Sequence, residues 1–260
     1  MKRICLISIF VFFTLSSCYK MDIEDIRDNP VEDVVSKFTG LPQIHIMTSL
    51  PDSAITKDSY IEAFITIKNS QKDSQWDTDS IPGKIKGRGH FTWTQPKKPY
   101  KIKFDDKVPV LGLPEDKEWV LLANYTDKSC LRNDLAFTIG YSCNSTWTPR
   151  FRFVELFYNN EYKGQYQLVE SIKRSKYRVN ISKEGFLLEI DHPARLESSD
   201  VYFSTQRNTF VLKDSKVASG SQEYLNIKNT ITTIENVLFS EDYADPVVGY
   251  RRYLNTLVSR

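Results

Sequence analysis

The clearest structural signal spans residues 151–170 and reads FRFVELFYNNEYKGQYQLVE. An apolar run ends at Tyr158, the pair Asn159 and Asn160 follows, and a second run over residues 164–169 leads back. Asparagine adopts the positive φ angles of a tight hairpin turn more readily than most residues. The segment therefore predicts a β-hairpin within an antiparallel sheet.

Short runs typical of strands lie on both sides of this hairpin. Each run is bounded by Pro, Gly, Asp or Asn, which often interrupt regular structure. Before the hairpin, the predicted strands are residues 43–47, 60–68, 83–86, 100–104 and 119–123. After it, residues 186–190 predict another strand, and residues 201–203 and 210–212 predict a second hairpin.

Two segments change to a helical period. In residues 127–141, Leu131, Leu135 and Ile139 lie four apart. Asp127 or Ser129 is placed to cap the first turn, and we expect this helix to pack on the sheet. Near the C-terminus a second helix is predicted, with residues 247–258 as the opening of a third. The apolar stripe of the second helix consists of Ile227, Ile231, Ile234 and Leu238.

The composition excludes several classes of protein. The 260 residues include 35 Lys and Arg against 33 Asp and Glu, and 13% are aromatic. A disordered chain would be poorer in aromatic residues, and a collagen-like chain would hold far more than 10 Gly and 11 Pro. A formal charge of +2 gives no overall attraction to nucleic acid or acidic membranes, so an anion site must be a local cluster.

The first 17 residues have the pattern of an export signal. Lys2 and Arg3 precede the apolar run 6–15, which is too short to span a bilayer, since that takes about 20 residues. The tetrapeptide LSSC at residues 15–18 resembles a bacterial lipobox, so Cys18 is predicted to carry lipid; an incidental Cys in a secreted protein is the alternative. Residues 18–40 would form an acidic tether at the bacterial cell envelope, with the outer membrane as the expected location.

Two cysteines remain in the folded part of the chain. Along a helix, Cys130 and Cys143 would lie about 20 Å apart, far beyond the ~7 Å limit for a disulfide. We expect two buried free thiols, unless the helix ends early and the chain doubles back. The three His, at positions 45, 90 and 192, are scattered and lack the spacing of a zinc site.

A second pattern concerns anion binding. The segment KIKGRGH at residues 84–90 ends a predicted strand in the turn Gly87-Arg88-Gly89, which exposes backbone N–H groups and lets a phosphate approach. Lys101 and Lys103 alternate on a nearby strand and share one face, which suits a polyphosphate. A plain β-turn beside a solvated sheet face is the alternative.

Six motifs follow one another along residues 42–191: IKGRGHFTW, KKPYKIKF, LGL, KEWVLLANYTDKSCLRNDLAF, FVELFYNNEYKGQYQLVESI and GFLLEID. Their order and approximate spacing resemble the CotH kinase family, atypical protein kinases of the spore-coat type that also occur as bacterial surface lipoproteins. The resemblance implies an α+β, divergent protein-kinase-like fold. Its antiparallel N-lobe sheet with a packed helix would span residues 41–172, and an incomplete helical C-lobe residues 173–260.

The resemblance also implies site residues. Gly87, Arg88 and Gly89 would form the loop near the phosphates, and Lys103, or alternatively Lys101, would pair with them. Arg132, in the LRN motif, would bind nucleotide or support the loop through a carboxylate such as Asp127. Glu170 would lie at the hinge beside adenine, or simply end its strand.

The implied cofactors are ATP with Mg²⁺ or Mn²⁺, and the implied partner is an exported or surface protein phosphorylated on Ser or Thr. Nucleic acid is not an expected partner. A membrane is expected to be reached through the lipid on Cys18.

Two departures from the family pattern matter. His90 and Phe91 stand where the family usually has Asn and Ser. The family's catalytic and metal-binding carboxylates follow the C-terminal helices in a WDxD-like segment, and this sequence reaches Arg260 without one; Asp191, Asp200 and Asp214 lie in the wrong context to replace them. Two hypotheses follow: a truncated kinase lacking its catalytic segment, or a non-catalytic surface module that binds nucleotide, protein or glycan.

Overall fold

The computed structural model describes residues 39–68, 74–143, 145, 147–182, 184–213, 216–245 and 247–249. The chain divides into two units, Met1–Gly40 and Leu41–Arg260, and nearly all described residues belong to the second. The predicted signal segment, Cys18 and the acidic tether lie outside the described residues, as does most of the helix expected over residues 247–258. No helix in the described ranges is long and apolar enough to cross a membrane.

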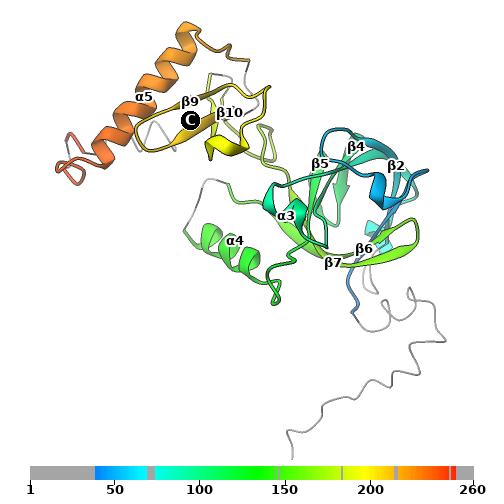
Figure 1. Cartoon of the computed structure of the whole chain (residues 1–260). Helices are drawn as coiled ribbons and strands as arrows, with labels where there is room; N and C mark the ends of the chain where they lie inside the picture. Colours follow the sequence, from blue (N-terminus) through cyan, green and yellow to red (C-terminus); the bar gives the residue numbers. More distant parts are fainter. Residues whose placement is uncertain are drawn as a thin grey trace, which may run out of the picture. The chain divides into compact units, whose positions relative to one another are not determined.

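Seven strands close into a barrel in the order β1-β2-β3-β4-β5-β7-β6 (Figure 1). Neighbouring strands are antiparallel, except that β1 and β6 run parallel and pair Gln43 with Glu155. This parallel pair closes the predicted antiparallel sheet into a barrel, and closure removes the exposed strand edges. The strands are β1 Gln43–Met47, β2 Ile61–Lys68, β3 Ile81–Gly87, β4 Tyr100–Val110, β5 Leu113–Leu122, β6 Phe151–Tyr158 and β7 Glu161–Glu170.

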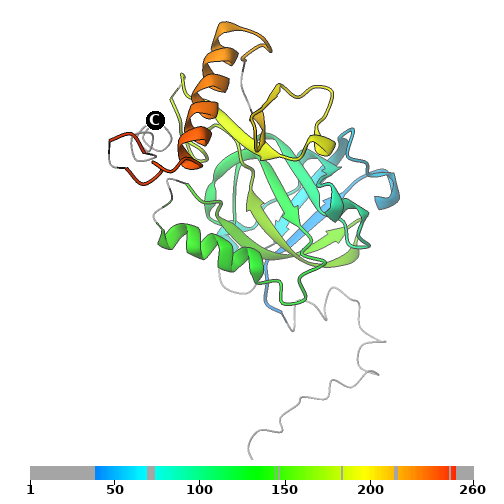
Figure 2. The same ribbon diagram turned by 60° about the vertical axis from the view of Figure 1, so that its left-hand side comes forward.

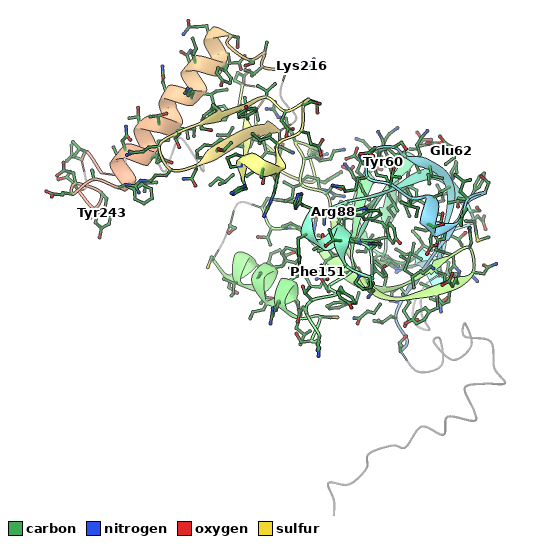
Figure 3. All side chains as sticks on the ribbon, in the orientation of Figure 1. Tyr60, Glu62, Arg88, Phe151, Lys216 and Tyr243 are labelled. Carbon is green, nitrogen blue, oxygen red and sulfur yellow. The ribbon has the colours of Figure 1, made fainter. Side chains whose placement is uncertain are left out.

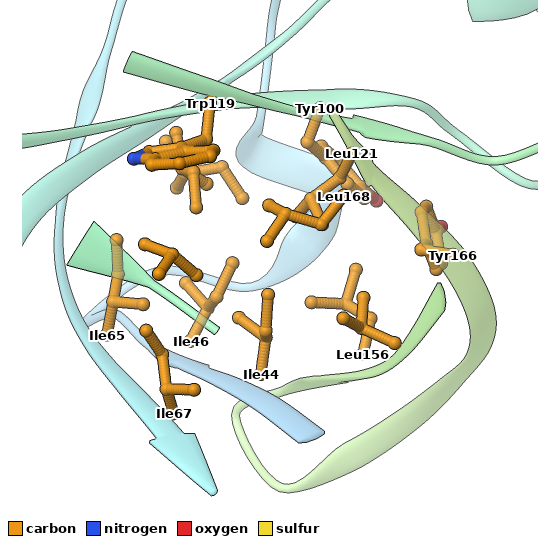
Figure 4. Packing of buried hydrophobic residues seen from close by; sticks show 14 of the residues in the cluster. Ile44, Ile46, Ile65, Ile67, Tyr100, Trp119, Leu121, Leu156, Tyr166 and Leu168 are labelled. Atoms are coloured by element: carbon orange, nitrogen blue, oxygen red, sulfur yellow. The ribbon is translucent and has the colours of Figure 1, made fainter. Parts of the chain in front are cut away.

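Apolar side chains fill the interior of the barrel (Figure 4). Successive side chains of a strand point to opposite faces, so each strand sends every second residue inward. In β2, for example, Ala63, Ile65 and Ile67 are buried, and the residues between them are more exposed. Each large apolar side chain buried in this way stabilises the fold by about 1.5–3 kcal/mol.

The hairpin predicted over residues 151–170 is confirmed. Asn159 and Asn160 form a two-residue turn with φ angles of 49° and 66°, and Tyr158 pairs with Glu161 across it. Positive φ at both turn residues matches the right-handed twist of the two strands. The side chain of Asn159 also accepts a hydrogen bond from the backbone N–H of Thr48, at 2.8 Å.

The helix that follows the barrel strands differs from the prediction. α4 begins at Arg132 and ends at Ser142, and none of its residues is buried. Leu131, Leu135 and Ile139 have exposed fractions of 54, 62 and 54%, so the prediction that this stripe packs on the sheet is wrong. α4 instead contacts the barrel through a different face, on which the ring of Phe137 lies 5.5 Å from the ring of Phe151 on β6.

The cysteine prediction is confirmed in one respect and wrong in another. Cys130 and Cys143 are both free thiols. Cys143 is exposed and Cys130 half-buried, so the expectation that both are buried is wrong.

The C-terminal part has a small sheet and one long helix (Figure 2). The sheet has the order β8-β10-β9, with β8 at Leu187–Asp191, β9 at Tyr202–Ser204 and β10 at Thr209–Lys213, so the second predicted hairpin is confirmed. α5 spans Gln222–Leu238, and its N-cap Ser221 accepts a hydrogen bond from the N–H of Tyr224.

Three of the four residues predicted for the stripe of α5 are buried, namely Ile227, Ile231 and Ile234, and they pack in a cluster with Phe203 and Leu212. Leu238, at the last turn, is 44% exposed. Short helical turns complete the fold: η1 Asp52–Ala54, η2 Ser74–Trp76, α3 Phe91–Thr94 and η3 Pro193–Arg195. The chain is thus a mixed α+β protein, and a closed barrel takes the place of the expected N-lobe sheet.

Candidate functional site

The register of β3, β4 and β5 places two rows of side chains on the outer face of the barrel. In the first row, Lys84 of β3, Lys103 of β4 and Glu118 of β5 lie opposite one another across the strands. In the next row, two residues along each strand, Lys86, Lys101 and Val120 lie opposite one another. The residues between these rows point inward. Ile85, Ile102 and Trp119, for example, are fully buried.

A third row continues this outer face. Arg88 follows the end of β3, and its backbone N–H donates to the carbonyl of Pro99, at 3.2 Å. Leu122 lies two residues beyond Val120 and therefore faces the same way. Arg88, Pro99 and Leu122 line a pocket of about 340 Å³, whose remaining walls come from residues 92–97 and 123–133.

Among the residues that the structure describes, three cationic side chains line this pocket, Arg88, Lys97 and Arg132, against one carboxylate, Asp127. Arg88 is half-buried beside α3 (Figure 3). Burial lowers the pKa of its guanidinium, and the charge of Glu189 opposes that shift. Within the described part of the chain, this guanidinium makes no hydrogen bond or ion pair, so an anion in the pocket would meet a cation without a protein partner.

Lys97 is held in place more firmly than Arg88. Its ammonium donates to the backbone carbonyl of Gln165 and lies 4.5 Å from the centre of the Tyr166 ring. Burial lowers the pKa of Lys97, with an opposing contribution from Cys130. Lys97 therefore adds positive charge at a fixed position in the pocket wall.

Asp127 organises the segment that leads into α4. Its carboxylate accepts hydrogen bonds from the Ser129 hydroxyl, at 2.6 Å, and from the backbone N–H of Arg132, at 2.9 Å. These hydrogen bonds hold the pKa of Asp127 below its ordinary value. The Arg132 Nε lies 3.8 Å from the same carboxylate, so the structure brings Arg132 into the pocket and also places it to support the loop.

Gly87 and Gly89 lack a side chain and so leave room for residues of α3 beside the loop. A Cβ on Gly87 would overlap the indole of Trp93, and a Cβ on Gly89, whose φ is 83°, would overlap the Thr92 hydroxyl. The N–H of Gly87 donates to the carbonyl of Thr56, at 2.7 Å. The N–H groups of Gly87 and Arg88 are thus engaged within the protein, and the side chain of Arg88 is the group that faces the pocket.

Lys101 and Lys103 lie outside the pocket, in the two neighbouring rows. The Nζ of Lys101 lies 2.9 Å from Glu118 Oε2, and the Nζ of Lys103 lies 3.9 Å from Oε1. Burial alone would raise the pKa of Glu118, but the hydrogen bond from Lys101 and the surrounding lysine charges outweigh it and lower the pKa. Lys101 is one row from Arg88, about 7 Å along the strand, and Lys103 is two rows away.

Glu170 lies away from these residues. It pairs with Trp119 in the ladder and points inward, where its carboxylate is fully buried. Arg178 and Arg150 both donate to it, at 2.5 and 2.9 Å. The structure thus places Glu170 in a buried ion-pair network, separate from the pocket.

Some pocket residues were not identified from the sequence. Lys97 belongs to the KKPY motif but precedes β4, the strand on which the alternation of Lys101 and Lys103 predicted a phosphate site. Asn124 and Asn133 are joined by a hydrogen bond of 2.9 Å between their side chains, which ties the end of β5 to α4. Asn133 belongs to the LRN motif, and that motif is the one sequence signal that pointed to this wall.

The family model described as CotH kinase protein matches residues 85–256, well over half of the chain. The chain belongs to the CotH kinase protein family. The matched part begins in β3, so the Arg88 loop, the pocket and the Lys101–Glu118 pair all lie in the CotH kinase region. No curated protein matches the chain. Among the described residues, no group of three or more His, Cys, Asp or Glu side chains is arranged to hold a metal ion.

Proposed function

We propose that this CotH kinase family member binds ATP, with the phosphates in the Arg88 pocket and along the adjoining lysine row, as the nucleotide-binding part of a kinase that phosphorylates Ser or Thr of an exported or surface protein. The catalytic carboxylates that the resemblance implies are not among the residues of this pocket. The observation that carries the proposal is Arg88, a half-buried guanidinium without a protein partner in the described residues. A guanidinium presents a planar fork of donors that matches phosphate oxygens.

The positive charge of the pocket supports this assignment. Phosphoryl transfer depends on positioning the phosphates and neutralising their charge more than on covalent chemistry by the protein. Arg88, Lys97 and Arg132 all line the pocket, and the hydrogen bond to the carbonyl of Gln165 holds the ammonium of Lys97 in place. Asp127, the one carboxylate among the described residues of the lining, already accepts hydrogen bonds from its own loop.

The Lys101–Glu118 pair offers a second element of a kinase site. In protein kinases, an ion pair with a glutamate holds a strand lysine against the phosphates. Here Glu118, on the neighbouring strand, holds the ammonium of Lys101 at 2.9 Å. We therefore assign the phosphate-pairing role to Lys101, with Lys103 as the outer member of the pair.

The described pocket fits phosphates better than a metal held by protein. Mg²⁺ is usually bound through one or two carboxylates together with waters and phosphate oxygens. Asp127 is the one carboxylate in the pocket wall, and its oxygens already accept hydrogen bonds.

Calorimetric titration with ATP tests the binding proposal. Replacing Arg88 by Gln should weaken ATP binding by about 1.5–3 kcal/mol, the usual scale of a hydrogen bond to a charged group. Arg152→Gln is the matched control, because Arg152 is exposed on β6 and lies outside the pocket. Equal affinity of the Arg88→Gln variant and the wild type would refute the assignment.

Phosphate transfer is tested separately with ATP labelled on its γ-phosphate. Incubation with exported proteins should label Ser or Thr, and the label should fall when Arg88 is replaced by Gln. ATP binding without any labelling would refute phosphate transfer by this chain and leave nucleotide binding as its function.

A further inference from the structure

Lys86 and Lys101 face each other across β3 and β4 as directly opposed residues of the ladder. Opposed side chains on one face of a sheet have Cβ atoms about 4.5–5.5 Å apart, and like charges in this position destabilise the sheet. The neighbouring row repeats the arrangement with Lys84 and Lys103. The outer face of β3 and β4 thus carries four ammonium groups in two adjacent pairs.

The two rows differ in how their charge is neutralised. In the outer row, Lys84 forms an ion pair with Glu62 at 2.5 Å, and Lys103 lies 3.9 Å from Glu118. In the row beside the pocket, Lys101 takes the closer contact with Glu118, at 2.9 Å.

Lys86, by contrast, contacts an aromatic ring. Its ammonium lies 5.0 Å from the centre of the Tyr60 ring, and no carboxylate among the described residues forms an ion pair with it. Burial, together with the charge of Glu118, raises the pKa of Tyr60 to about 12, so the phenol stays neutral and does not balance the lysine. The row next to the pocket therefore has excess positive charge at Lys86.

We propose that Lys86, opposite Lys101, binds the terminal phosphate of a nucleoside triphosphate whose inner phosphates contact Arg88. Lys86 is then a specificity-determining residue that favours triphosphates over monophosphates. The inference rests on the proposed function of the Arg88 pocket and extends it to the length of the phosphate chain.

The geometry of β3 supports placing the terminal phosphate at Lys86 and the inner phosphates at Arg88. Lys86 and Arg88 are two residues apart and face the same way, about 7 Å along the strand. A single phosphate in the Arg88 pocket is too short to reach the Lys86 row as well, whereas a chain of three phosphates extends from one row to the next. The bound chain would also relieve the repulsion between the opposed ammonium groups.

Titration of the full chain with ATP and with AMP tests the proposal. Lys86→Gln should weaken ATP binding about tenfold and leave AMP binding within about twofold of the wild type. Lys84→Gln is the matched control, because Lys84 lies on the same strand and face but is paired with Glu62. Lys86→Arg, which keeps the charge, should retain most of the preference for ATP.

The outcomes separate this inference from the function on which it rests. If Arg88→Gln weakens both nucleotides while Lys86→Gln and Lys84→Gln have equal effects, the pocket binds phosphate but the role of Lys86 is refuted. If Arg88→Gln leaves both affinities unchanged, the proposed function fails. If the wild type binds ATP and AMP equally well, selection by chain length is refuted whatever the variants do.

Discussion

Arg178 Nη1 lies 2.5 Å from Glu170 Oε1, and both side chains are completely excluded from solvent. The Arg178 guanidinium also lies 4.7 Å from the Trp119 ring, and Arg150 donates to the same carboxylate. Glu170, the last residue of β7, is thus the centre of a buried charge network. Such a position favours a structural role over contact with adenine.

Replacing Glu170 by Gln should lower the free energy of unfolding by about 3–5 kcal/mol, because Arg178 would remain buried without its counter-charge. Urea unfolding measures the change. Glu62→Gln, which removes the exposed partner of Lys84, should cost no more than about 1 kcal/mol. Equal losses for the two variants would contradict a buried network at Glu170.

Gly87→Ala should destabilise the protein by about 1–3 kcal/mol, because the added methyl group overlaps the indole of Trp93. Thermal unfolding measures the loss. In a protein that already carries Trp93→Leu, Gly87→Ala should lower the stability much less, since the two changes act on one contact. Strictly additive effects would show that Gly87 is needed for another reason.

Acidification should expose the contribution of Glu118. Its pKa in the folded protein is below its ordinary value of 4.5, so its stabilising contribution is present above that pH and is lost as the pH falls through the folded pKa. Glu118→Gln should therefore be less stable than the wild type at neutral pH, and the difference should shrink below about pH 4.5. Unfolding curves collected between pH 7 and pH 2 test this, and a constant difference would contradict it.

Cys18→Ala should release the protein from the membrane fraction of its natural host, because we propose that the lipid on Cys18 is the anchor. Fractionation followed by immunoblotting measures the distribution. Cys143→Ala is the control and should leave the distribution unchanged, since Cys143 is an exposed free thiol after α4. A Cys18→Ala protein that still pellets with membranes would refute the lipobox.

Local patterns in the sequence predicted local structure well. The Asn159-Asn160 turn followed from the tolerance of Asn for positive φ, and the stripe of α5 followed from its spacing. Barrel closure could not be foreseen in this way, because it depends on β1 pairing with β6, more than 100 residues away.

The candidate site was only partly accessible from the sequence for the same reason. Alternation places Lys101 and Lys103 on one face, but the register with β3 and β5 decides that Lys86 faces Lys101 and that Glu118 holds it. Arg88 was identified from its loop, whereas its place in a pocket with Lys97 and Arg132 requires the tertiary structure. Glu170 has the same polar character in sequence whether it faces ligand or core.

The most direct test of the central claim is a crystal structure of the protein with a non-hydrolysable ATP analogue. We predict that phosphate oxygens lie within hydrogen-bonding distance of the Arg88 guanidinium, with the terminal phosphate toward Lys86 and Lys101. A nucleotide bound elsewhere, or a pocket that stays empty at saturating analogue, would contradict the account.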